Sequence, residues 1–208
     1  MSDAVGPYPA PSLPPTFGPT PAQTVGPYFA IGLTRDRPQD ADAVEPYHAD
    51  AIELSGLVLD GLGDPIVDAF VELWGADPNG RFNHPDDPRG AAVYEGFTGF
   101  ARAPTDDTGR WTARTLKPGP LPAADGDGLQ APHIALVVFA RGVNIGLNTR
   151  VYFDDENDAN AKDPVLNSIE WVKRRETLIA RREDRNGERV YRFDIRIQGD
   201  DETVFFDI

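Results

Sequence analysis

Hydrophobic and polar residues alternate along most of the chain from residue 52 onward, and this pattern predicts a series of short β-strands. Residues 52–60 form the first run, and residues 66–76 form the second, after a GLGDP turn of the kind that joins hairpin arms. Residues 96–116 are typical of a strand, an Asp/Gly turn and another strand. A last pair of strands is expected at residues 189–199 and 202–208.

The stretch QAPHIALVVFARG, residues 130–142, predicts a buried strand with two distinct faces. Alternate residues of a strand point to opposite faces. One face carries Ile134, Leu136 and Val138, and the other carries His133, Ala135, Val137, Phe139 and Arg141.

Helical signals are few. Residues 157–176 are the one helical candidate, which Pro164 interrupts, so one or two short turns are expected there. Residues 24–33 are predicted as a turn that leads into a short apolar run. Residues 1–20 hold six prolines and little apolar periodicity.

Together these patterns predict an all-β fold: an antiparallel β-sandwich with long loops, a proline-rich N-terminal arm and one or two short helical turns. We expect residues 1–48 to form the arm and a partner-contacting segment. Residues 49–208 are expected to form the sandwich domain.

Composition limits the classes of molecule that this chain is expected to bind. The chain has 208 residues and a formal net charge of −14, from 34 acidic and 20 basic residues, which argues against nucleic acid and anionic membranes as partners. No apolar run approaches the ~18 residues that a membrane span needs. The first residues lack the basic start and apolar core of a signal peptide. The sequence has no cysteine, which excludes disulfides and thiolate chemistry and fits a cytoplasmic location.

One local exception to the acidic character is the segment KRRETLIARRED. A solvated face, balanced by neighbouring acids, is one interpretation of it. A subunit contact or an anion-steering patch is the other. Its basic residues are Lys173, Arg174, Arg175, Arg181 and Arg182, and its acids are Glu176, Glu183 and Asp184.

The chain has three histidines. His48 and His84 fall in predicted loops, where we expect surface residues. His133 begins the predicted strand and shares a face with Arg141, about 26 Å further along a fully extended chain. By itself, His133 is expected to be a structural hydrogen-bonding residue.

Four blocks in one order give the sequence a resemblance to a known family. They are LSGLVLDGLGDPIVDAFVELWGADPNGRF, DDTGRWTARTLKPGP, APHIALVVFARG and TRVYFDDE. The chain from about residue 20 to 208 resembles the intradiol ring-cleavage dioxygenases, iron(III) enzymes on a β-sandwich scaffold. Some of these enzymes combine two homologous chains, α and β. The blocks TPAQTVGPYFAIGL, NAKDPVLNSIE, RRETLIARRE and YRFDIRIQGDDETVFFDI resemble the α chain.

The resemblance implies that this chain has lost its own iron site. The family's catalytic chain holds iron(III) with two tyrosinates and two histidines, because a hard trivalent ion prefers anionic oxygen donors. The family's tyrosine after K-P-G is Leu121 here, and the H-x-H motif begins at His133 but ends in Ala135. The family's arginine position holds Gln130. An ungapped alignment puts Arg89 at the second tyrosine, although Tyr94 could approach the site.

The same resemblance assigns this chain a role in a partner's active site. Thr24, Gly26, Pro27 and Tyr28 match the α-chain segment that lines the β chain's pocket. Arg141 matches an arginine that approaches the carboxylate of a bound aromatic acid, for which a guanidinium is well suited. Without the resemblance, we would interpret Arg141 as part of a strand-end salt bridge and residues 24–28 as a plain turn.

The expected assembly therefore has Fe(III) in a homologous β subunit and none in this chain. The αβ units would form a larger oligomer, with a carboxylated catechol at the interface. One alternative is a self-sufficient dioxygenase whose atypical ligands include His133, Tyr94 and loop carboxylates. The other alternative is a β-sandwich binding module without an enzymatic partner.

Overall fold

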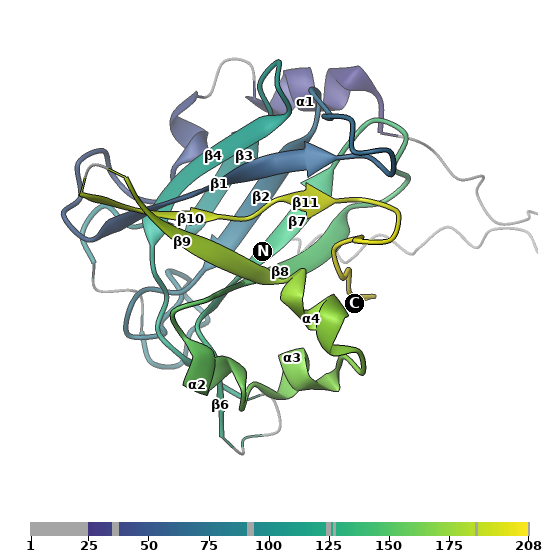
Figure 1. The fold of residues 1–208 in the computed structure, drawn as a ribbon. Coiled ribbons are helices and arrows are strands. Elements are labelled where there is room, and N and C mark those ends of the chain that lie inside the picture. Colours follow the sequence, from purple (N-terminus) through teal and green to yellow (C-terminus); the bar gives the residue numbers. More distant parts are fainter. Residues whose placement is uncertain are drawn as a thin grey trace, which may run out of the picture.

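The structure is a computed structural model. It describes residues 25–34, 38–90, 94–123, 126, 128–185 and 187–207. Figure 1 shows strands wrapped around one core, with short helices at both ends. The strands are β1 (Ala51–Leu59), β2 (Phe70–Gly75), β3 (Phe100–Pro104), β4 (Arg110–Leu116), β5 (Leu121–Pro122), β6 (Leu129–Gln130), β7 (His133–Phe139), β8 (Leu147–Phe153), β9 (Ile179–Arg185), β10 (Glu188–Arg192) and β11 (Ile195–Arg196). The helices are α1 (Pro27–Thr34), the 3-10 turn η1 (Pro38–Ala41), α2 (Asn157–Asn160), α3 (Pro164–Ser168) and α4 (Val172–Glu176).

The predicted β-sandwich is confirmed. One layer contains β4, β1, β10 and β9, and the other contains β8, β7, β2 and β3. Pairing of β8 with β9 joins the two layers along one side. On the other side β3 and β4, consecutive strands from opposite layers, contact each other, so the sheet is nearly closed.

The inward faces of both layers form one hydrophobic core. From the first layer, Trp111 and Leu54 are fully buried, and from the second, Leu136 and Phe153 are fully buried. The alternation predicted for residues 130–142 is correct, because Ile134, Leu136 and Val138 all lie in this core. Burial of these side chains is the main source of stability for such a fold.

The sheet is mixed, whereas the sequence pattern predicted only antiparallel pairing. Strand β1 pairs in parallel with β10 and β11, and β8 pairs in parallel with β9. Parallel neighbours need a long crossover connection. Between β8 and β9 that connection consists of α2, α3 and α4, which lie together at one end of the sandwich (Figure 1).

Short helices occur where the sequence predicted a broken helical segment. Pro164 begins α3 rather than ending a helix, since proline is tolerated in the first helical position. Asp163 caps this helix by accepting a hydrogen bond from the backbone N–H of Leu166. None of the helices in the described residues is long and apolar enough to cross a membrane.

Three local predictions were wrong. Residues 27–34 form helix α1, where the sequence suggested a turn and a short apolar run. The GLGDP turn closes only one antiparallel bridge, between Leu59 and Pro65, and β2 is not its second arm, because β1 and β2 belong to different layers. Residues 202–207 form no strand and contribute a single bridge, between Phe206 and Asn148.

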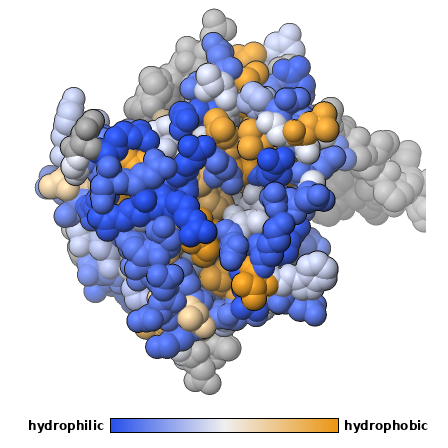
Figure 2. Space-filling view, viewed as in Figure 1, coloured by the Kyte–Doolittle hydropathy of each residue, from blue (hydrophilic) through white to orange (hydrophobic). Residues whose placement is uncertain are grey.

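Strand β9 was not predicted. Residues 181–185 of this strand are all exposed and charged, so they carry no apolar alternation. The face in Figure 2 is correspondingly mostly hydrophilic, with hydrophobic residues showing between the polar ones. The proposed boundary between residues 48 and 49 stays a prediction.

Candidate functional site

A cavity of about 290 Å³ lies at the His133 end of β7. Four residues that the family resemblance assigned to a lost iron site all line it, and so does Arg89 from the loop after β2. The structure therefore brings Arg89 to the same cavity as Ala135, which lies 46 positions later in the sequence. The residues that line the cavity are Trp74, Phe82, Arg89, Leu121, Pro122, Gln130, His133, Ala135 and Arg150.

Two turns pack against each other to form one wall. Asp77 begins the first turn, and its side chain accepts hydrogen bonds from the backbone N–H groups of Asn79 (2.8 Å) and Arg81 (2.9 Å). Gly119, in the second turn, donates its N–H to the carbonyl of Asp77 at 2.9 Å. A Cβ atom on Gly119 would lie 2.2 Å from the carbonyl oxygen of Pro78, so only glycine allows this approach. The glycine thus fixes the position of Leu121, two residues later.

Strand pairing sets the opposite wall. His133 is paired with Tyr152, and Ala135 is paired with Arg150, across the antiparallel strands β7 and β8. Directly paired residues point to the same face of a sheet. Arg150 therefore lies beside Ala135, the position that the family resemblance assigns to a histidine.

Gln130 is held in place by two hydrogen bonds. Its amide nitrogen donates to the carbonyl of Pro122 at 2.8 Å. Its amide oxygen accepts a hydrogen bond of 2.7 Å from the Arg150 guanidinium. Gln130 is thus a neutral partner for a cation.

His133 is buried and engaged as a structural residue. Its Nδ1 atom donates to the carbonyl of Ala131 at 2.8 Å, and its ring lies 5.4 Å from the ring of Tyr152. Burial is the main reason that the pKa of His133 falls to about 4, and the nearby Arg150 charge lowers it further. At neutral pH the imidazole is therefore uncharged.

Arg89 is neutralised by a neighbouring carboxylate. Its Nε and Nη2 atoms donate to the two oxygens of Asp87, at 3.0 and 2.9 Å. The hydrogen bonds from Arg89 hold the pKa of Asp87 far below its ordinary value. Arg89 also donates to the carbonyl of Gly80, so it forms a fixed part of the cavity wall.

The residues around this cavity do not fit iron(III). His133 is the one imidazole among the described lining residues, and no tyrosine is among them. The guanidinium of Arg150, which has no carboxylate partner among the described residues, would repel a trivalent cation. Tyr94 is not among the lining residues and packs against the separate cluster of Val44, Phe97 and Leu116.

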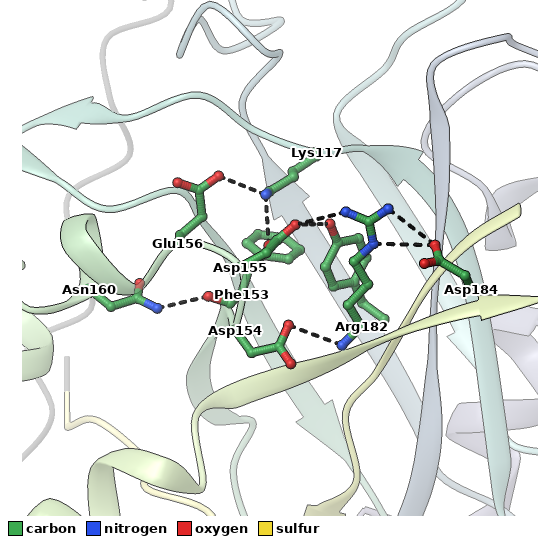
Figure 3. Close-up of polar contacts among 9 residues, drawn as sticks. Lys117, Phe153, Asp154, Asp155, Glu156, Asn160, Arg182 and Asp184 are labelled. Carbon is green, nitrogen blue, oxygen red and sulfur yellow. Dashed lines mark hydrogen bonds and ion pairs between the residues drawn. The ribbon is translucent and has the colours of Figure 1, made fainter.

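A second polar cluster lies outside the residues that line the cavity (Figure 3). Lys117 forms ion pairs with Asp155 at 2.8 Å and with Glu156 at 2.7 Å. Tyr191 donates to the other oxygen of Asp155 at 2.8 Å, and Arg182 approaches that oxygen to 3.5 Å. Burial alone would lower the pKa of Lys117, but the two carboxylates outweigh it and raise this pKa. The cluster joins residues that follow β4 and β8 to residues within β9 and β10, so its role is structural.

Arg141 lies beyond the other end of β7 and does not line this cavity. Its guanidinium pairs with Asp68, and its side chain is 61% exposed. The strand-end salt bridge that the sequence allowed is therefore present in the single chain. Exposure leaves the guanidinium accessible to a neighbouring molecule.

The segment with Gly26 and Tyr28 lies beside Arg141. The N–H of Val25 donates to the carbonyl of Val143 at 3.1 Å, and the Phe29 ring lies 5.5 Å from that of Phe139. Tyr28 is 84% exposed. No atom lies within 4 Å of a Cβ built on Gly26, so nothing within the described chain requires glycine there. Pro27 begins α1, and Thr24 lies outside the described residues.

The other two histidines lie in loops, as expected, each accepting a backbone hydrogen bond through Nδ1. His48 accepts from Asp50, and His84 accepts from Asp86, both at 3.2 Å. Four of the five basic residues at 173–182 have carboxylate or carbonyl partners, including Asp201 for Lys173 and Asp184 for Arg182. These contacts agree with a solvated, charge-balanced face.

Sequence reasoning missed two features of the site. Arg150 lies in the motif TRVYFDDE but was not recognised as a lining residue, because only the register of β8 against β7 places it there. Trp74 and Phe82 also went unnoticed. Their rings stack at 5.8 Å with an interplanar angle of 3° and form an aromatic wall.

Comparisons with known proteins place the chain among the dioxygenases. A family model described as "Dioxygenase" matches residues 25–199. The chain is 49% identical over 198 residues to the protocatechuate 3,4-dioxygenase alpha chain of Pseudomonas putida, covering 90% of this chain and 96% of that one. It is 32% identical over 157 residues to the protocatechuate 3,4-dioxygenase beta chain of Burkholderia cepacia, covering 73% and 66%. The fold resembles catechol 1,2-dioxygenase from Acinetobacter sp. ADP1, with a TM-score of 0.54, 20% identity, and coverage of 74% and 55%.

Proposed function

The chain belongs to the intradiol ring-cleaving dioxygenase family, and from that premise we propose that it is the iron-free α subunit of a protocatechuate 3,4-dioxygenase. The enzyme would open the ring of protocatechuate between its two hydroxyl-bearing carbons. Both atoms of dioxygen enter the product, 3-carboxy-cis,cis-muconate. The iron(III) would lie in a homologous β subunit, and the two chains would form αβ units in a larger oligomer.

The observation that carries this proposal is the content of the chain's own cavity. The family resemblance assigns Leu121, Ala135 and Arg89 to three positions at which the catalytic chain has iron ligands, and all three side chains line the cavity. None of these side chains donates an electron pair to a metal. Replacing donors by a leucine, an alanine and a paired arginine leaves a cavity that cannot hold the ferric ion with the required geometry.

The opposite end of β7 supplies the second argument. Arg141 and helix α1 lie side by side there, and Tyr28, Phe29 and Ile31 expose apolar surface. An exposed apolar surface beside a guanidinium suits a contact with another chain in which a carboxylate is bound. In the proposed assembly, Gly26, Pro27, Tyr28 and Arg141 line the β subunit's pocket, together with Thr24.

Co-expression with a homologous β chain tests this function. We expect the two chains to co-purify and to consume dioxygen with protocatechuate, and we expect the α chain alone to be inactive. Activity of the isolated chain would favour a self-sufficient dioxygenase. A chain that remains separate from the β chain, and does not change its activity, would favour a binding module without an enzymatic partner.

A further inference from the structure

We propose that the cavity formed by Trp74, Phe82, Gln130 and Arg150 is a binding site for a small aromatic carboxylate, with Arg150 as its anchor. The site lies within this chain, at the end of β7 opposite to Arg141. It is therefore distinct from the partner pocket of the proposed function and does not depend on that function being correct.

The first observation is an unbalanced charge. Arg150 is partly buried, and its guanidinium donates a hydrogen bond of 2.7 Å to the neutral amide oxygen of Gln130. It also contacts the neutral Tyr152 hydroxyl. Among the described residues, no carboxylate lies within 4.0 Å of its guanidinium, whereas Arg89 has Asp87. A guanidinium withdrawn from water is stabilised by an anionic partner. Its planar fork matches a carboxylate in two-pronged fashion.

Asp163, a buried carboxylate that contacts Tyr152, already has hydrogen-bond partners. Asp163 accepts hydrogen bonds from the backbone N–H groups of Ala131 and Leu166, both at 2.7 Å. It also accepts one of 3.2 Å from the Tyr152 hydroxyl. Asp163 thus serves as a helix cap and backbone anchor and does not pair with Arg150.

The second observation is the aromatic wall. The parallel rings of Trp74 and Phe82 line the cavity of about 290 Å³, here called the inner cavity, together with Leu121 and Pro122. A flat apolar ring gains contact area against such a wall, and aromatic pairs stack favourably. The combination of an apolar wall with one convergent cation is typical of small-molecule sites.

Size and access agree with a ligand of one ring. The inner cavity measures about 290 Å³, at the small end of known ligand sites, which span roughly 300–1,000 Å³. A wider groove of about 620 Å³ shares Trp74, Phe82, Arg89 and Pro122 with it. A ligand can therefore enter through this groove with its carboxylate directed at Arg150.

Calorimetric titration of the full-length chain with benzoate tests the proposal. Benzoate lacks catechol hydroxyls, so binding cannot depend on iron. We expect saturable binding, and we expect Arg150→Gln to weaken it about tenfold or more, as loss of a charge-assisted contact predicts. Arg192→Gln is the matched control, because Arg192 is also a strand arginine, but it is paired with Asp194 and lies outside the cavity. The control should bind like the wild type.

A second variant tests the same proposal if Arg150→Gln fails to fold. Ala135→Glu places a carboxylate opposite Arg150 and should reduce benzoate affinity while the circular dichroism spectrum and melting temperature are kept. Benzyl alcohol has the aromatic ring but no carboxylate, and inorganic phosphate has negative charge but no ring. Both should bind more weakly than benzoate. No saturable binding of benzoate, equal affinity for phosphate, or an unchanged affinity in Arg150→Gln would each overturn the proposal.

Discussion

Ala135 and Arg150 face each other across the antiparallel strands β7 and β8, and both line the same cavity. This pairing places a cation beside Ala135, the position that the family resemblance assigns to a second histidine ligand. The absence of a histidine at residue 135 and the presence of Arg150 beside it are consistent with each other, because a guanidinium would repel a ferric ion bound next to it.

Restoring the missing histidine alone should not restore an iron site. In Ala135→His the motif H-x-H is complete, but Leu121, Arg89 and Arg150 remain. We expect this variant, incubated with iron and desalted, to contain no stoichiometric metal. Iron bound at a one-to-one ratio would show that Arg150 does not exclude the metal.

Arg141→Ala should impair the assembled enzyme selectively. Loss of the guanidinium removes a charged contact to a carboxylate, so KM for protocatechuate should rise about tenfold or more. Catechol has no carboxylate, and its turnover should change little. Arg192→Ala is a matched control, because Arg192 also donates through Nε and Nη2 to one aspartate oxygen. Equal effects of Arg141→Ala on both substrates would contradict a role in binding the carboxylate.

Lys117→Met should destabilise the chain by roughly 2–3 kcal/mol, because it leaves Asp155 and Glu156 without their shared cation in a partly buried cluster. Urea unfolding measures the loss. Lys173→Met is the control: its ion pair with Asp201 is highly exposed, and such pairs contribute little. A similar loss of unfolding free energy in both variants would mean that the cluster in Figure 3 stabilises the chain no more than an exposed ion pair does.

Stability should depend on pH through His133. The pKa of His133 is lowered from 6.5 to about 4 in the folded chain, so between these values the unfolded chain binds the extra proton. Its contribution to stability is therefore complete above pH 6.5 and is lost as the pH falls toward 4, a change of about 3 kcal/mol. His133→Gln should lose less stability than the wild type between pH 7 and pH 4. Parallel pH profiles for the two proteins would be inconsistent with a buried neutral histidine.

The sandwich was predictable because its core strands alternate strongly. Ile134, Leu136 and Val138 in β7 show this, and all three are buried. Strand β9 was not predictable, since its residues 181–185 are charged and exposed, and only long-range pairing makes them a strand. Helix α1 was missed because PYFAIGL combines a proline, a glycine and β-branched or aromatic residues.

The site was predictable only in part. Motif spacing located Leu121, Gln130, His133 and Ala135 correctly in one place, because H-x-H and K-P-G fix short segments. Arg150 required the register of two strands, which a single sequence does not contain. The aromatic wall likewise depends on a loop that returns Phe82 to Trp74.

The iron content of the complex between this chain and a homologous β chain tests the central claim most directly. If this chain is the iron-free subunit, elemental analysis will find one iron ion for each pair of chains, and the α chain purified alone will be colourless and free of iron. Two iron ions for each pair, or tyrosinate-to-iron charge-transfer absorption in the isolated chain, would contradict the account.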